Sequence, residues 1–339
     1  MANTDVHAPV REDWLARSEE PLAVPDIPIV DAHHHLWDRP GSRYLLGEYL
    51  RDLEQVPQVR ATVYVQCRSF YLDEGPGEFR PLGEVRFVRS VAEASPSVPT
   101  VCQAVVGGAD LSLGHQVERV LDAMEEDSGC RLRGIRNQTA WHADPRIVSS
   151  PYQAEPDRLL RKEFRDGVRV LGRRGLSLDV WAYHTQLGQV LALARECPET
   201  TIIVDHFGGP LGIGPYAAGS RAVLDRWHRG MDGLSRCPNV VVKLSGAGMR
   251  VFGFGFDQPQ QPPTSGEVAS AMAPYFDACL DRFGASRCML ASNFPVDKGM
   301  FGYRVLWNAF AECAASLPAT EQHDLFHRTA ERVYRLDDL

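Results

Sequence analysis

Several signatures of whole protein classes are missing from this sequence. In its 339 residues no apolar run approaches the length that spans a bilayer, and no block of basic residues occurs in a chain whose net charge is −8. We therefore expect neither a membrane protein nor a protein that binds nucleic acid or an anionic membrane surface. The polar, acidic segment 1–26 also lacks the basic-then-apolar order of a secretion signal.

Closely spaced cysteines are missing as well. The eight cysteines are dispersed without a C-x-x-C motif, and several lie inside apolar runs. This distribution is typical of reduced, buried thiols rather than of disulfides or a cysteine-bound zinc. Together with the missing secretion signal, it predicts a cytoplasmic protein.

A glycine-rich dinucleotide loop is the third absence, because Val106-Gly107-Gly108-Ala109 does not fit G-x-G-x-x-G. What the sequence contains instead is eight short β-branched or apolar runs that alternate with longer amphipathic segments. Most runs are continuously apolar, as expected of parallel strands covered on both faces. The expected strands are 27–32, 61–67, 100–107, 132–136, 176–181, 201–206, 240–245 and 287–292.

This alternation favours an α/β fold of the TIM (β/α)8 type over an open doubly wound sheet. The expected helices are 48–55, 81–94, 114–124, 155–174, 185–197, 220–236, 265–283, 301–316 and 320–335. We predict a single barrel domain over residues 27–339, preceded by an N-terminal arm over residues 1–26.

The first expected strand runs directly into three consecutive histidines. Because side chains alternate along a strand, His33 and His35 should point to one side and His34 to the other. Two imidazoles on one side of a strand end can bind a divalent cation or take part in catalysis. A surface cluster of polar side chains is the alternative for this stretch alone.

Other polar side chains fall at the C-terminal ends of expected strands, where barrels carry their chemistry. Each has a simple structural explanation, such as a salt bridge to a nearby loop or a helix cap. Six of the eight strands end in such groups, however, and this convergence predicts one site. Besides the histidines, the groups are Arg136, Tyr183-His184, Asp205-His206, Lys243 and Ser292-Asn293.

Three of these motifs resemble the amidohydrolase superfamily: Asp31-Ala32-His33-His34-His35, Val204-Asp205-His206-Phe207-Gly208-Gly209-Pro210 and Ser292-Asn293-Phe294-Pro295. More narrowly, the chain resembles the amidohydrolase-2 lactonase branch, which includes L-fuconolactonase and pyrone-dicarboxylate hydrolases. The similarity runs from about Pro28 to the C-terminus. It implies a distorted (β/α)8 barrel and hydrolysis of a cyclic ester, with one divalent metal in some members and none in others.

The resemblance also implies roles for single residues. His33, His35 and His206 match the family's histidines and would bind one zinc or manganese ion, if a cofactor is used at all. Arg136 matches an arginine that contacts acid groups of the substrate in relatives. The sequence departs from the family at Asn293, where an aspartate commonly takes a proton from the attacking water and can ligate the metal.

An asparagine has no basic oxygen at neutral pH, which leaves three interpretations of the chemistry. A nearby residue supplies the base, with Asp297, His184 or a metal-free His206 as the candidates. Alternatively, a metal on His33, His35 and His206 lowers the pKa of water enough for a weak base. In the third interpretation the reaction needs no strong base.

Loops after the strands are expected to form the substrate pocket. Trp37, Tyr183 and Arg68 are predicted to bind substrate together with Arg136. Segment 249–264 alternates phenylalanine with glycine, which fits either a mobile flap or a surface excursion packed on the barrel rim.

The leading hypothesis is therefore a hydrolase that opens a lactone or a similar cyclic carbonyl compound. Its partner would be a small molecule, a cyclic ester with an acidic or carbonyl group, and homo-oligomers remain open. One alternative is a decarboxylase or carbon–carbon bond hydrolase of the same superfamily. Another is a ligand-binding pseudoenzyme that lacks the usual aspartate base.

Overall fold

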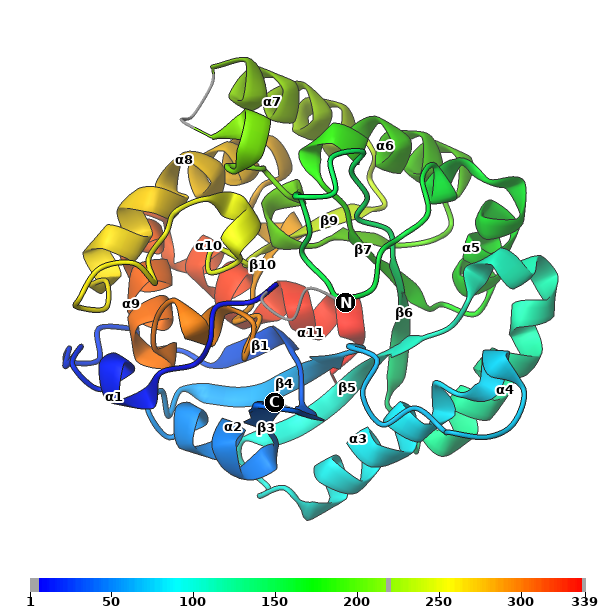
Figure 1. The fold of residues 1–339 in the computed structure, drawn as a ribbon, viewed down its shortest axis with the longest axis horizontal. Coiled ribbons are helices and arrows are strands. Elements are labelled where there is room, and N and C mark those ends of the chain that lie inside the picture. The colour runs from blue at the N-terminus through cyan, green and yellow to red at the C-terminus, as the bar shows by residue number, and fades with distance from the viewer. Residues whose placement is uncertain (1–5, 218–220, 337–339) are drawn as a thin grey trace.

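Eight parallel strands form one sheet that curls into a nearly closed barrel with helices around its outside (Figure 1). The structure is a computed structural model, and it describes residues 6–217 and 221–336; the outermost parts of the two predicted regions, 1–5 and 337–339, lie outside the described residues. In the barrel each strand pairs with the next barrel strand along the chain, which is the predicted TIM (β/α)8 arrangement.

All eight predicted strands overlap a barrel strand. The barrel strands are β1 (Ile29–His34), β4 (Val59–Val65), β5 (Thr100–Gly108), β6 (Leu132–Gln138), β7 (Ser177–Trp181), β8 (Ile202–Val204), β9 (Val240–Leu244) and β10 (Cys288–Leu290). A small antiparallel hairpin, β2 (Trp37–Arg39) and β3 (Ser42–Tyr44), follows β1.

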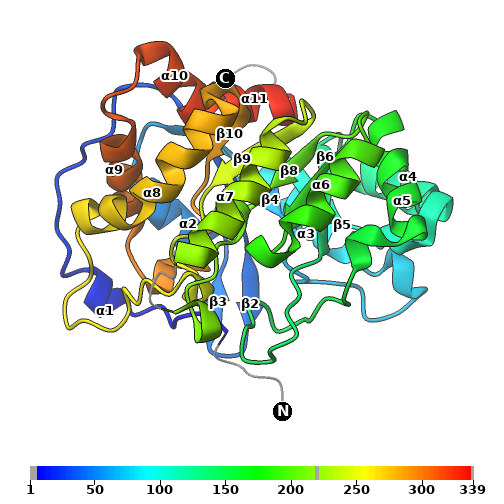
Figure 2. The same ribbon diagram turned by 90° about the horizontal axis from the view of Figure 1, so that it is seen from above.

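Most of the helices cover the outer face of the barrel, whereas α1 (Glu12–Leu15) and α11 (Thr329–Tyr334) lie at its two ends (Figure 2). The others are α2 (Leu46–Leu53), α3 (Leu82–Ala94), α4 (Glu118–Asp127), α5 (Lys162–Arg173), α6 (Leu187–Glu196), α7 (Arg221–Ser235), α8 (Ser265–Phe283), α9 (Tyr303–Ala314) and α10 (Ala319–His323). None of the helices in the described ranges is long and apolar enough to cross a membrane.

Helix α8 shows why its predicted bounds agree with the observed ones. The Thr264 hydroxyl accepts a hydrogen bond from the Glu267 amide at 3.3 Å, and the Thr264 amide donates to Glu267 Oε2 at 2.8 Å. This capping box fixes the first turn, and Gly284, with φ of 71°, ends the helix. The predicted helix 320–335 is instead interrupted by a π-helical turn, Asp324–Arg328. After this turn α11 crosses the end of the barrel that lies opposite the β2–β3 hairpin (Figure 2).

Two apolar layers hold the barrel together. The larger lies between the sheet and the helices. The smaller fills the barrel interior with compact side chains, because little space remains inside eight tilted strands. Its members from the strands include Val30, Ala32, Ala61, Val63, Val65, Ala104, Val106, Ile203, Val241 and Met289. All eight cysteines are unpaired and five are buried, as the sequence predicts.

The barrel closes in an unusual way between its first and last strands. In the described chain β1 and β10 are not paired as strands, and one isolated bridge joins His34 to Phe294 just beyond β10. The Asn293 backbone N–H donates to the His33 carbonyl at 2.8 Å, and the His35 backbone N–H donates to the Phe294 carbonyl at 2.7 Å. The histidine strand is thereby tied to the turn that carries Asn293.

A buried carboxylate joins the two strands where backbone pairing is lacking. Asp31 accepts hydrogen bonds from the Ser292 amide at 2.8 Å, the Ser292 hydroxyl at 2.6 Å and the hydroxyls of Tyr49 and Tyr303 at 2.8 and 3.0 Å. Burial raises the pKa of Asp31, and these donors oppose the rise. The side chain thus takes the place of part of the missing ladder.

The first part of the described N-terminal arm, through α1, lies at the same end of the barrel as the β2–β3 hairpin, opposite α11 (Figure 2). Arg11 donates to the Asp257 carbonyl at 2.9 Å, and the Trp14 indole donates to the Pro259 carbonyl at 3.3 Å. Both partners lie in segment 249–264, whose residues Val251 and Phe252 are buried. That segment therefore packs on the barrel rim, in agreement with its interpretation as a surface excursion.

Candidate active site

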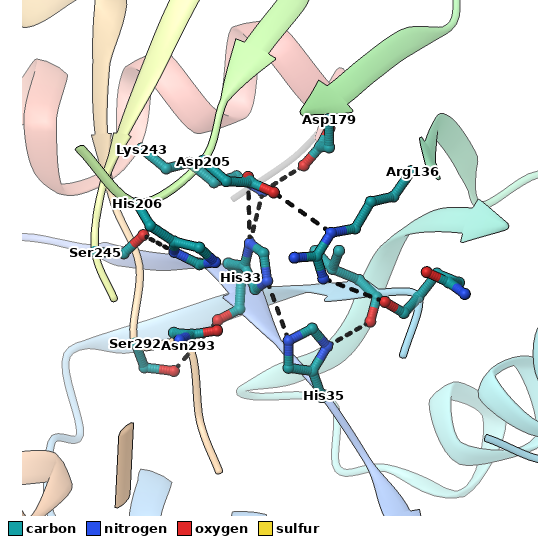
Figure 3. Close-up of polar contacts among 12 residues, drawn as sticks. His33, His35, Arg136, Asp179, Asp205, His206, Lys243, Ser245, Ser292 and Asn293 are labelled. Carbon is teal, nitrogen blue, oxygen red and sulfur yellow. Dashed lines mark hydrogen bonds and ion pairs between the residues drawn. The ribbon is translucent and has the colours of Figure 1, made fainter. Parts of the chain in front are cut away.

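His33 and His35 lie at the C-terminal end of β1 and face the same side of the strand (Figure 3). Their Nε2 atoms are 3.2 Å apart. His34 points the other way, where its ring stacks on Tyr49 and its Nε2 lies 3.0 Å from the Thr62 hydroxyl. The strand periodicity thus separates two site histidines from one that packs behind the sheet.

Hydrogen bonds determine the tautomers of these two histidines. His35 Nδ1 lies 2.7 Å from the Val65 carbonyl, which can only accept, so this nitrogen carries the proton and Nε2 is bare. His33 Nε2 must then donate to His35 Nε2, which leaves His33 Nδ1 as an acceptor. The Lys243 ammonium, 3.2 Å from His33 Nδ1, supplies the matching donor.

Lys243 is fully buried and belongs to a charge cluster beneath the histidines. Its Nζ donates to Asp179 Oδ2 at 2.6 Å and lies 3.6 Å from Asp205 Oδ1. The Arg136 Nε lies 3.5 Å from Asp205 Oδ2, and the Tyr334 hydroxyl donates to Asp179 at 3.1 Å. Two cations and two carboxylates therefore balance inside the barrel (Figure 3).

The two carboxylates respond differently to this cluster. Burial raises the pKa of Asp179, and the charge of Lys243 only partly offsets that rise. Burial acts on Asp205 in the same direction, but Lys243 and Arg136 together outweigh it and hold the pKa of Asp205 below its usual value. Asp205 is therefore the permanent anion next to the histidines.

His206 approaches the other two histidines from the turn after β8. Its ring centroid lies 4.8 Å from that of His33, and its Nδ1 lies 2.9 Å from the Ser245 hydroxyl. The backbone at His206 has φ of 54°, a left-handed conformation that turns the chain off the sheet. Gly246 makes room for the ring, since a Cβ there would lie 2.7 Å from His206 Cγ.

All three site histidines are neutral at pH 7. Burial lowers their pKa values well below the usual range, and neighbouring positive or ionisable groups lower them further. Neutral imidazole can ligate a metal or accept a proton.

Asn293 and Asp297 form a second polar pair at the pocket. Asn293 Nδ2 donates to Asp297 Oδ1 at 2.7 Å, and the Gly248 amide donates to Asp297 Oδ2 at 3.0 Å. Burial raises the pKa of Asp297 to about 7. Among the described residues no donor hydrogen bonds to Asn293 Oδ1, and Asn293 lines the pocket while Asp297 lies behind it.

The pocket lies at the barrel mouth and encloses about 60 Å³. Of the predicted site residues, its wall includes His35, His206, Asn293, Arg136, Trp37 and Arg68. The wall does not include Tyr183 or His184. The Tyr183 hydroxyl instead lies 2.8 Å from Ser149 Oγ, and His184 Nδ1 accepts from the Leu211 amide at 3.2 Å.

Comparison with known proteins gives the family of this chain. Its residues 30–336 match the sequence profile of the Amidohydro_2 family, described as amidohydrolase. The chain belongs to the amidohydrolase family. Protein y4mH of Sinorhizobium fredii is 31% identical to it over 92% of this chain and 99% of its own length.

Two further relatives are described by an activity or by a bound metal. An L-fucono-1,5-lactonase of Burkholderia ambifaria is 27% identical, covering 91% of this chain and 96% of its own. The crystal structure of an amidohydrolase from Burkholderia multivorans with bound zinc superposes with a TM-score of 0.70 at 26% identity, covering 91% of this chain and 99% of that one. The resemblance inferred from the motifs is thus confirmed.

The residues of this amidohydrolase fit a divalent metal. His33, Asp205 and His206 each offer an atom, and these atoms lie within 4.8 Å of one another, while His35 presents a bare Nε2 beside them. His33 would present its own Nε2 once its proton moves to Nδ1. Asp205, 3.5 Å away and without a hydrogen-bond donor in the described chain, can accept a hydrogen bond from that Nδ1–H.

Sequence reasoning missed two parts of the site. Asp179 lies within an apolar strand, and a lone charged residue in such a run is the signal that could have revealed it. His7 of the N-terminal arm lies outside the residues matched by the family, yet it lines the pocket with its ring stacked toward Trp37. Burial, together with Arg39 and Arg250, lowers the pKa of His7 to about 4. No local pattern in the arm predicts that contact.

Proposed function

We propose that this amidohydrolase opens a lactone by adding water to the ring carbonyl. The observation that carries the proposal is that neutral His206, the carbonyl of Asn293 and the guanidinium of Arg136 converge on one pocket. The similarity to L-fucono-1,5-lactonases over nearly the whole chain supports the choice of bond.

In this scheme the attacking water lies between Asn293 Oδ1 and His206. The amide oxygen accepts one hydrogen bond and orients the water, while the imidazole takes the proton as the oxygen attacks the carbonyl carbon. Arg136 stabilises the developing oxyanion or a substrate carboxylate. The imidazolium then returns the proton to the departing ring oxygen, so that the product is a hydroxy acid.

The surrounding residues prepare these groups. Ser245 fixes the ring of His206, and Asp205 stabilises the positive charge that His206 gains. Asp297 holds the amide of Asn293 so that its oxygen faces the pocket. A zinc or manganese ion, when present, would be held by His33, His35 and His206 and would activate the water as a Lewis acid, in place of proton abstraction by His206.

A panel of five- and six-membered sugar lactones tests this function at pH 7. We expect acid release with at least one of them, recorded with a pH indicator, because each ring opening frees one carboxylic acid. Evolution of carbon dioxide from aromatic carboxylates without acid release from lactones would identify a decarboxylase instead. Ligand-induced increases in Tm with no turnover would identify a binding protein.

The Asn293–Asp297 pair predicts an acid limb in the pH profile. With the pKa of Asp297 near 7, its carboxylate gains a proton below that pH and becomes a weaker acceptor for Asn293 Nδ2. We expect kcat/KM to fall roughly tenfold per pH unit below 7. Asp297→Asn should flatten this limb, and an unchanged limb in that variant would contradict the assignment.

A loss of folding stability caused by the titration of Asp297 cannot produce the same acid limb in the activity. Its folded-state pKa lies above the value of an unfolded aspartate, so its contribution to stability is complete at low pH and is lost as the pH rises through about 7. Stability and activity therefore change in opposite directions over this window. Urea denaturation at pH 5.5 and 7.5 provides the control.

A further inference from the structure

A second cavity, here called the annex, opens beside the histidine pocket. It encloses about 500 Å³, against about 60 Å³ for the histidine pocket, and both are lined by Gln66, Arg68, Arg136 and Gln138. Ligand pockets usually enclose roughly 300–1,000 Å³, so the histidine pocket is small and the annex is not. A molecule whose carbonyl reaches the histidines thus has room to extend on the annex side.

The lining of the annex carries an excess of positive charge. Four arginines face it, Arg68, Arg136, Arg158 and Arg161, against the two acidic residues Asp110 and Glu155. Arg158 pairs with Asp110 at 2.5 Å, and Arg161 pairs with Glu155. The remaining two positive charges belong to the arginines that also line the histidine pocket.

Arg68 is the cation left available to a ligand. It contacts no carboxylate among the described residues, whereas Arg136 already faces Asp205. Its guanidinium lies 4.7 Å from the centroid of the Tyr152 ring, and its backbone has φ of 62°. A left-handed conformation at a residue other than glycine is costly, and such strain is concentrated at functional sites.

We propose that the annex is a subsite for an oxyanionic group, such as a carboxylate, sulfonate or phosphate, on an arm of the substrate outside the lactone ring. The position of the ring rests on the proposed function. Arg68 binds the oxyanion at the junction of the two cavities. A lactone with a neutral arm leaves this guanidinium without a charged partner, so the annex selects by charge.

Two lactones that differ only in the end of this arm, a carboxylate or its primary amide, test the subsite. Hydrogen bonds to a charged group are worth roughly 1.5–3 kcal/mol, so we expect kcat/KM to favour the carboxylate by about ten- to hundredfold. Arg68→Ala should remove most of this preference by raising KM for the carboxylate, with kcat within twofold. Arg146→Ala, a mostly exposed arginine paired with Asp144 and outside both cavities, is the matched control.

The outcomes separate this inference from the proposed function. If both lactones open at the same rate and Arg68→Ala changes neither, the annex assignment fails while lactone hydrolysis stands. If neither lactone opens, the proposed function fails, and calorimetry with the ring-opened diacid and its monoamide tests the annex without turnover. Tighter diacid binding that Arg68→Ala abolishes supports the subsite, and equal binding overturns it.

Discussion

Replacement of His206 by alanine is expected to lower kcat/KM for lactone opening by roughly a hundred- to ten-thousandfold, the usual contribution of a general base. The reason is geometric, because His206 is a neutral imidazole that lines the pocket and is held in place by Ser245. Steady-state kinetics on the best lactone of the panel, with circular dichroism to verify folding, measures the effect.

His184→Gln is the control for this experiment. His184 is also a buried histidine with a lowered pKa, and the sequence offered it as a base, yet it lies outside the pocket wall. We expect its replacement to change kcat/KM by less than about tenfold, which is below the range expected for a lost general base. A larger loss in His184→Gln than in His206→Ala would contradict the proposed base. Metal content, measured alongside, separates loss of a ligand from loss of a base.

Replacement of Lys243 by methionine is expected to produce the largest loss of stability. The side chain is fully buried and faces two carboxylates, so its removal leaves Asp179 and Asp205 with only Arg136 to balance them. Breaking a buried ion pair in this way costs roughly 3–5 kcal/mol. The free energy of unfolding, from urea denaturation at pH 7, records the change.

A double variant tests whether charge is the cause. Lys243→Met with Asp179→Asn removes one charge of each sign and keeps the side-chain volumes similar, so it should recover a substantial part of the loss. Equal losses in the single and double variants would show that packing around the lysine stem, rather than the uncompensated carboxylate, accounts for the effect.

The barrel itself could be predicted from the sequence because its signals are local. Most of the barrel strands are short apolar runs, and helix α8 carries its own boundaries in the Thr264–Glu267 capping box and Gly284. The π-helical turn at Asp324–Arg328 was not predictable, since it depends on how the chain packs on the end of the barrel opposite the pocket. Tertiary packing overrides periodicity there.

The site was predictable where the strand ends determine it. His35, His206, Arg136 and Asn293 converge because the C-terminal ends of parallel strands meet at one end of a barrel. The position of Tyr183 and His184 behind the wall, and the entry of His7 into it, depend on how loops fold back. No spacing rule encodes those loop paths. The sequence therefore suggested Tyr183 and His184 as site residues and gave no sign of His7, but it could not predict where any of the three lies relative to the pocket.

The closure of the barrel through Asp31 has a consequence for synthesis of the chain. Its carboxylate is bound by Ser292 and Tyr303, which follow it by 261 and 272 residues. During translation these partners emerge late, so β1 leaves the ribosome long before its buried acid can bind both of them. The contacts that join β1 to the last strand therefore form only after nearly the whole polypeptide has been synthesised. A nascent chain that stops before the turn at Asn293 lacks part of these contacts, so its barrel cannot close in this way.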